Sequence, residues 1–229
     1  MNFARNILDF NNQLQLELNG LTDEIQVLNP FKGDGSKTIE RISKSFYNKF
    51  YSDDNKRKLI LGINPGRLGA GSTGIPFTDT KRLKQCGIEV DFELHEPSSV
   101  YVYKVIDAFG GAEKFYEDFY ISSVCPLGFV KRNDKGNWVN YNYYDDLKLQ
   151  KLVEPFILKS LIQQIKFGLD TSKIYCLGTG KNFKFLNKFN KEHKLFGEII
   201  PLEHPRYIMQ YKSKNQDLYV DKFLRLLSE

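Results

Sequence analysis

Residues 59–79 read LILGINPGRLGAGSTGIPFTD, and the interpretation of the whole chain depends on this stretch. Residues 57–64 form a short apolar run that predicts a buried strand ending at an asparagine. The glycines within residues 69–74 have the G-x-G-x-x-G spacing of a dinucleotide-binding loop. Such a loop needs its first glycine at the strand end and its last glycine in a helix. Here Pro65 intervenes, and residues 75–77 (Ile-Pro-Phe) are a poor helix start, so the context argues against a nucleotide cofactor.

Short apolar, β-prone runs recur at residues 119–128, 173–180 and 197–205. Helical periodicity separates them, and helices are predicted over residues 3–18, 37–50, 98–109, 145–167, 181–193 and 214–227. Short buried strands that alternate with helices indicate a parallel sheet with helices on both faces. The predicted fold class is therefore α/β, a three-layer α/β/α sandwich around a central, mainly parallel four-stranded sheet.

Four residues lie at or just past the ends of these predicted strands. They are Asn64, Ser123, Gly178 and His204. The carboxyl ends of parallel strands meet at one edge of a sheet, where ligands bind. We therefore expect the fold to bring these four residues together.

The length and composition limit the classes of protein to which this chain can belong. A chain of 229 residues without linkers or repeats predicts a single domain over residues 1–229. No apolar run approaches the roughly 20 residues that a membrane-spanning helix needs, and the amino-terminal residues lack the apolar core of a signal peptide. We therefore expect a cytoplasmic protein with no membrane partner.

The cysteines and the charge say less about function. The three cysteines, Cys86, Cys125 and Cys176, form no C-x-x-C pair, which argues against a metal site or a disulfide framework. The net charge of +5 is compatible with a nucleic-acid partner but is too small to indicate one alone.

Three short motifs give a more specific interpretation. The segments GINPG (62–66) and TGIPF (73–77) together resemble the first motif of the uracil-DNA glycosylase superfamily, especially its single-strand-selective monofunctional branch. VCPL (124–127) is similar to the middle motif, and HPR (204–206) to the start of the last one. The resemblance covers residues 57 to 210 or so, in the right order.

This chain departs from the branch in two places. Ser123 stands where the middle motif normally has an asparagine. The last motif is normally H-P-S-P-R, whereas this chain has His204-Pro205-Arg206-Tyr207. The protein therefore resembles a divergent relative of the branch.

The resemblance implies a catalytic pair. Asn64 would orient the attacking water through its side-chain amide. His204 would stabilise the anion that develops on the departing base, either as neutral imidazole or as imidazolium. No lysine lies in the motifs where a Schiff-base nucleophile would be expected, so strand nicking is not predicted.

The resemblance also implies how the base and the DNA are held. Phe77 would stack on the flipped base, Ile63 and Gly66 would line the base site, and Ser123 would face the edge of the pyrimidine. We expect the DNA contacts to come from a wedge at Arg206 and Tyr207, with Lys212 and Lys214 on phosphates.

The implied activity is that of a monofunctional DNA glycosylase, acting on uracil or other deaminated bases in DNA during base excision repair. It would act as a monomer, without a metal or another cofactor. Two alternatives stay open at this point. One is a protein of the same fold that binds nucleic acid with weak or no catalysis, and the other is a nucleoside or nucleotide hydrolase.

Overall fold

A parallel four-stranded sheet lies at the centre of the structure, a computed structural model that describes residues 2–18 and 24–228. The strands occur in the order β3-β2-β6-β7, and each neighbouring pair is parallel. Their bounds are Arg57–Gly62 for β2, Phe119–Ser123 for β3, Leu169–Leu177 for β6 and Glu198–Leu202 for β7. The predicted fold class is confirmed.

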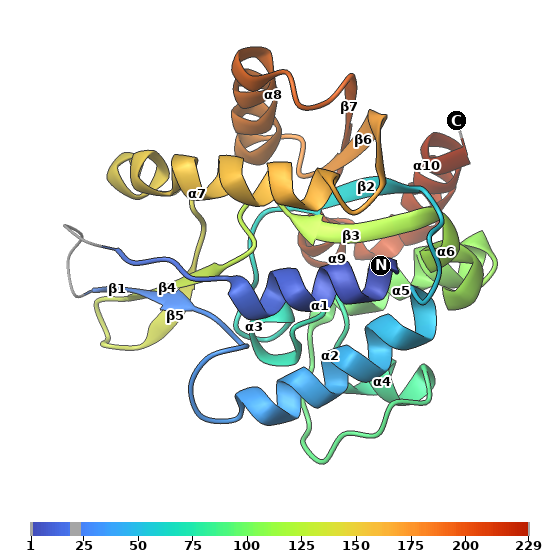
Figure 1. The fold of residues 1–229 in the computed structure, drawn as a ribbon, viewed down its shortest axis with the longest axis horizontal. Helices are drawn as coiled ribbons and strands as arrows, with labels where there is room; N and C mark the ends of the chain where they lie inside the picture. The colour runs from blue at the N-terminus through green and yellow to red at the C-terminus, as the bar shows by residue number, and fades with distance from the viewer. Residues whose placement is uncertain (1, 19–23, 229) are drawn as a thin grey trace.

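Helices cover both faces of this sheet (Figure 1). One layer contains α1 (Phe3–Gln13) and α7 (Leu147–Ile165), and the other contains α5 (Pro97–Phe109) and α10 (Gln216–Ser228). The remaining helices are α2 (Ser36–Phe50), α3 (Ala70–Thr73), α4 (Thr80–Gln85), α6 (Ala112–Asp118), α8 (Lys181–His193), α9 (Pro205–Tyr211) and the 3-10 turn η1 (Ser213–Asn215).

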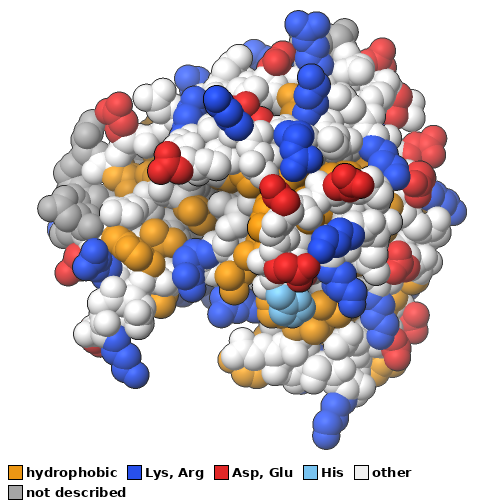
Figure 2. Space-filling model, turned by 90° about the horizontal axis from the view of Figure 1, so that it is seen from below, with side chains coloured by type: hydrophobic (Ala, Val, Ile, Leu, Met, Phe, Trp, Pro, Cys, Tyr) orange, Lys and Arg blue, Asp and Glu red, His pale blue; other side chains and the backbone are white. Residues whose placement is uncertain are grey.

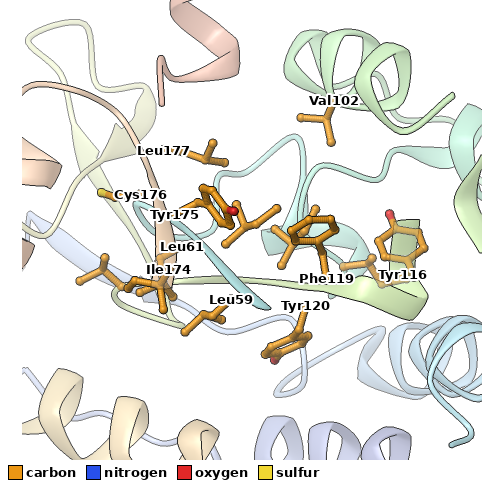
Figure 3. Packing of buried hydrophobic residues seen from close by; sticks show 14 of the residues in the cluster. Leu59, Leu61, Val102, Tyr116, Phe119, Tyr120, Ile174, Tyr175, Cys176 and Leu177 are labelled. Carbon is orange, nitrogen blue, oxygen red and sulfur yellow. The ribbon is translucent and has the colours of Figure 1, made fainter. Parts of the chain in front are cut away.

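The strand side chains alternate between the two helical layers because successive residues of a strand face opposite ways. Figure 3 shows Leu59 and Tyr120 on one side of the strands and Tyr175 and Leu177 on the other. The Tyr120 ring packs against Phe3 of α1, with ring centroids 5.5 Å apart. The core therefore lies on both faces of the sheet and leaves the strand ends open.

A second sheet was not predicted. The strands β1 (Ile25–Leu28), β4 (Gly128–Arg132) and β5 (Trp138–Tyr141) form it in the order β1-β4-β5, with antiparallel pairing. Figure 1 shows it on the side toward which the arrowhead of β3 points. It therefore stands beside the carboxyl ends of the parallel strands.

The expected strand over residues 119–128 is divided between the two sheets. The main-chain N–H of Val124 and that of Cys125 still donate to the oxygens of Gly62 and Ile63, at 3.0 and 3.1 Å. Pro126 has no N–H to continue this pairing, and the chain turns into β4. The first helix is also shorter than predicted, since it ends at Gln13.

Among the described residues, no helix is both long enough and apolar enough to cross a membrane.

A buried arginine ties the first helices to the sheet. Arg57, at the start of β2, is 0% exposed, and its guanidinium forms two hydrogen bonds with the Asp53 carboxylate, at 2.8 and 2.9 Å. Its Nε donates to the main-chain oxygen of Tyr116 at 2.7 Å. Its Cζ lies 4.7 Å from the Phe3 ring centroid and 4.8 Å from that of Tyr51. One side chain thus connects α1, α6 and the segment after α2 to β2.

Asp53→Asn is expected to lower the free energy of unfolding by about 2 kcal/mol, because it leaves the buried Arg57 charge without its carboxylate. The loss is smaller than for a fully buried pair because the Asp53 side chain is 40% exposed. Urea denaturation followed by circular dichroism measures it.

The matched control is Asp9→Asn, which breaks the exposed ion pair between Arg5 and Asp9. That variant is expected to change stability by less than about 0.5 kcal/mol. Equal losses of unfolding free energy in Asp53→Asn and Asp9→Asn would contradict the role given to Arg57.

Candidate active site

The strand ends surround one pocket of about 500 Å³. The residues that the sequence predicts for catalysis and base binding all line it. They are Ile63, Asn64, Gly66, Phe77, Ser123 and His204, and Arg206 lies at the same pocket. They come from the segment after β2, the end of β3 and the start of α9. The parallel sheet therefore gathers residues that lie far apart in the sequence.

Four predicted residues lie elsewhere. Gly178 does not line the pocket, because its N–H donates to the Leu202 oxygen at 2.7 Å and so continues the pairing of β6 with β7. Tyr207 is 43% exposed on α9, where its ring packs against Tyr211 at 5.5 Å. Lys212 follows the end of α9, and Lys214 lies in η1. None of the four lines the pocket.

Asn64 is held by the end of β5 and the residues directly after it. Its Nδ2 donates to the main-chain oxygen of Tyr141 at 3.2 Å, and its Oδ1 accepts from the main-chain N–H of Tyr143 at 3.1 Å. These two partners fix which atom of the amide is oxygen. A carboxamide oxygen has two lone pairs, so Oδ1 keeps one acceptor site free at the pocket.

His204 is held in the structure as a neutral hydrogen-bond donor. It caps α9, and its Nδ1 accepts from the main-chain N–H of Arg206 at 3.1 Å. This bond requires Nδ1 to be unprotonated, so the ring proton is on Nε2. Burial, with a smaller effect of the Arg206 charge, lowers the pKa of His204 to about 4. The histidine is therefore neutral at physiological pH.

Phe77 lies at the wall of the pocket in a strained conformation. Its φ is +52°, which is uncommon for a bulky residue. Its ring contacts that of His204 edge to face, with centroids 5.9 Å apart. The next two residues are buried: the Thr78 hydroxyl donates to the Pro76 oxygen at 3.0 Å, and Asp79 caps α4. The buried loop holds the aromatic ring in place.

The glycine spacing of residues 69–74 serves close packing. A Cβ at Gly71 would lie 2.2 Å from Leu28 of β1, and a Cβ at Gly69 would lie 2.5 Å from the Glu96 carboxyl. Both distances are shorter than any real contact of this kind. The loop is glycine-rich because β1 and Glu96 approach its backbone closely.

Ser123 ends β3 at the pocket and is 8% exposed. Among the described residues, its hydroxyl has no hydrogen-bond partner. A serine hydroxyl can both donate and accept, so this group is available to a ligand.

Glu96 is a pocket residue that the sequence did not indicate. It precedes α5, and its Oε2 is buried without a hydrogen-bond partner. Burial, followed by the negative charge of Asp79, raises the pKa of Glu96 to about 8. The carboxyl is therefore largely protonated at neutral pH, and no sequence motif marks it.

Asn140 of β5 also lines the pocket and was missed. Its Oδ1 accepts from the main-chain N–H of Arg67 at 2.9 Å. The sequence does contain a signal for β5, the strand that carries Asn140. Residues 133–137 (NDKGN) are turn-forming and separate two β-prone runs. Reading that turn as a hairpin would have placed β5 beside the site.

Among the residues that the structure describes, no group of three or more His, Cys, Asp or Glu side chains is placed to hold a metal ion. The three cysteines are buried and unpaired.

Glu96→Gln is expected to stabilise the protein as pH rises. Near pH 4.5 the glutamate is protonated in the folded chain and about half protonated in the unfolded one, so the two states differ little. Between about pH 5 and 8 the unfolded state is ionised while the folded state stays largely protonated, so wild type loses stability across this range, whereas the glutamine variant does not. The Tm of the variant should exceed that of wild type by about 3 °C or more near pH 8.

The control is Glu198→Gln, since Glu198 is exposed at the start of β7. It should leave the pH dependence of Tm as in wild type. A Glu96→Gln variant whose Tm follows wild type at every pH would refute the raised pKa.

Comparisons with known proteins agree with this geometry. None of the curated proteins compared matches the chain. A crystal structure of wild-type Pedobacter heparinus SMUG2 superposes with a TM-score of 0.95 at 49% sequence identity, and the match covers 100% of this chain and 97% of that one. The family model of the uracil DNA glycosylase superfamily matches residues 49–228, which is more than half of the chain. This chain belongs to the uracil DNA glycosylase superfamily.

Proposed function

We propose that this protein is a monofunctional DNA glycosylase that hydrolyses the N-glycosidic bond of uracil in DNA, as a step of base excision repair. One observation carries the proposal. Asn64, Ser123 and His204 meet in a single pocket beside Phe77, and the histidine is held there as a neutral donor. Family membership and the likeness to SMUG2 support a glycosylase-like activity.

His204 would act on the leaving group. When the bond between C1′ and N1 breaks, its electron pair departs with the base, and negative charge develops on the pyrimidine oxygens. The Nε2–H of His204 would donate to one of them. A preoriented donor in a water-poor site stabilises such an anion more strongly than water does.

Asn64 would place the water. The free lone pair of its Oδ1 can accept one hydrogen from a water molecule, whose oxygen then adds to C1′ as the base leaves. The released proton passes to solvent or to the departing base. Because Tyr141 and Tyr143 hold the amide, the water would be positioned without further rearrangement.

The base itself would be held on three sides. Phe77 supplies a ring for stacking, Ser123 a hydroxyl for the edge of the base, and Ile63 with Gly66 the remaining wall. To reach this pocket the nucleotide must leave the base stack, which costs least in an unpaired strand.

The surface supplies charges for the DNA backbone. Figure 2 shows a face that is hollowed at its lower edge, with Lys and Arg side chains on the lobes to either side of the hollow. Arg206 lies at the pocket, and Tyr207 and Lys212 follow it along α9 and at its end. We propose that these three contact the strand that carries the flipped nucleotide.

Uracil release should require both catalytic residues. His204→Ala is expected to lower the single-turnover rate by about 10²–10³-fold, and Asn64→Ala by about 10²–10⁴-fold. Alkali-revealed cleavage of labelled oligonucleotides with one uracil measures this, in single strands and opposite guanine or adenine.

Because the pKa of His204 is about 4, titration of this residue should not alter the wild-type rate between about pH 5 and 7.

His193→Ala is the matched control, since His193 lies at the end of α8 away from the pocket. Release by His204→Ala at the wild-type rate would remove the role given to that residue. If no uracil strand is cleaved by wild type, xanthine and hypoxanthine are tested next. DNA binding without release of any base would favour a binding protein, and release from free nucleosides alone would favour a nucleoside hydrolase.

Ser123 should set the choice of base. A serine hydroxyl is short and rotates freely, whereas an asparagine can donate and accept at once along the pyrimidine edge. Ser123→Asn is expected to raise the ratio of the rate on uracil to the rates on xanthine and hypoxanthine by roughly fivefold, the value of one hydrogen bond. Using a ratio cancels any loss of folded enzyme, and unchanged ratios would contradict this assignment.

A further inference from the structure

The hairpin formed by β4 and β5 carries an arginine stacked on a tryptophan. Arg132 and Trp138 lie directly opposite each other in the register of the two strands. The Cζ of Arg132 lies 5.0 Å from the centroid of the Trp138 ring. Arg132 is exposed and Trp138 is partly covered, so the guanidinium faces solvent with the indole behind it.

This stack continues the wall of the pocket. Alternate residues of a strand share a face, so Trp138 lies on the same side of β5 as Asn140, one step of about 7 Å away. Asn140 lines the pocket and binds the main chain of Arg67. The Arg132–Trp138 stack is therefore the next group outward from the pocket on the second sheet.

The charge of this surface is free to meet a ligand. In the described part of the chain, the arginine ion pairs are made by Arg5, Arg57 and Arg82. Arg132 is among the described arginines without an acidic partner, together with Arg41, Arg67, Arg206 and Arg225. On the opposite face of the hairpin, Lys131 lies over the Tyr141 ring and within 3.9 Å of a Glu24 oxygen. Arg132 thus carries an uncompensated charge on the face of the hairpin that also holds Asn140.

We propose that the Arg132–Trp138 stack binds a base of the unpaired DNA strand next to the nucleotide in the pocket. A planar guanidinium offers a face on which a base can stack, while its charge meets the neighbouring phosphate. Bases inside a duplex already stack on both sides, so this surface selects a single strand. The assignment rests on the proposed function, because it takes DNA as the ligand.

The protein contains its own reporter for this contact. Trp138 is the only tryptophan of the chain. Tryptophan emission is followed while an undamaged oligothymidine of about 20 nucleotides is added to wild-type protein. Emission is expected to change with the same midpoint as the anisotropy of the labelled strand. Binding by anisotropy with constant tryptophan emission would overturn the proposal.

Variants separate stacking from charge. Arg132→Ala and Trp138→Ala are each expected to weaken oligothymidine binding about tenfold, the loss of one stacked base. Arg132→Ala should also lower the slope of log K against log salt by about 0.7, the value of one phosphate contact on a single strand. Arg132→Lys keeps the charge without the planar face, so it should weaken binding but retain the wild-type slope.

Lys131→Ala is the control, because it removes the same charge from the other face of the hairpin; its affinity should stay within about twofold. The proposal would be overturned if both Arg132→Ala and Trp138→Ala bound oligothymidine with wild-type affinity. It would also be overturned if the two variants lost as much affinity for duplex DNA as for oligothymidine. Undamaged DNA makes this test independent of catalysis. Failure to release uracil would refute the proposed function, whereas failure of these binding changes would refute the hairpin contact alone.

Discussion

The parallel pairing of β2 with β3 and β6, and of β6 with β7, is the constraint on which the site depends. Strands that run the same way end at the same edge, so Asn64, Ser123 and His204 meet although 140 residues separate the first from the last (204 − 64). Each of these residues lies at or just beyond the last hydrogen bonds of its strand. The pocket is therefore formed by the points where the sheet stops pairing.

The second sheet completes this edge. It binds the amide of Asn64 through the main chain near Tyr141 and Tyr143, and it presses Leu28 against the backbone at Gly71. The residue proposed to place the water is thus also a structural link between the two sheets. We infer that the rigidity of Asn64 comes from β5 and the residues directly after it, since its hydrogen bonds outside its own segment go to Tyr141 and Tyr143.

The pocket combines polar groups with little net charge. Burial keeps His204 neutral by lowering its pKa to about 4, and together with the charge of Asp79 it raises the pKa of Glu96 to about 8. Both groups can donate a hydrogen bond in these states. Such a pocket favours an uncharged ligand, and its donors stabilise negative charge that develops on that ligand.

The sequence by itself determined the α/β class, the four parallel strands and the residues at their ends, because short apolar runs and helical periodicity are local signals. The motif resemblance also indicated Phe77, which periodicity alone does not mark. Only the tertiary structure decided that Glu96 and Asn140 line the pocket, that Gly178 does not, and that His204 is neutral. The lining of the pocket and the protonation state of His204 depend on which sequence-distant groups come near the pocket and on how much water those groups exclude. The spacing of residues along the chain indicates neither.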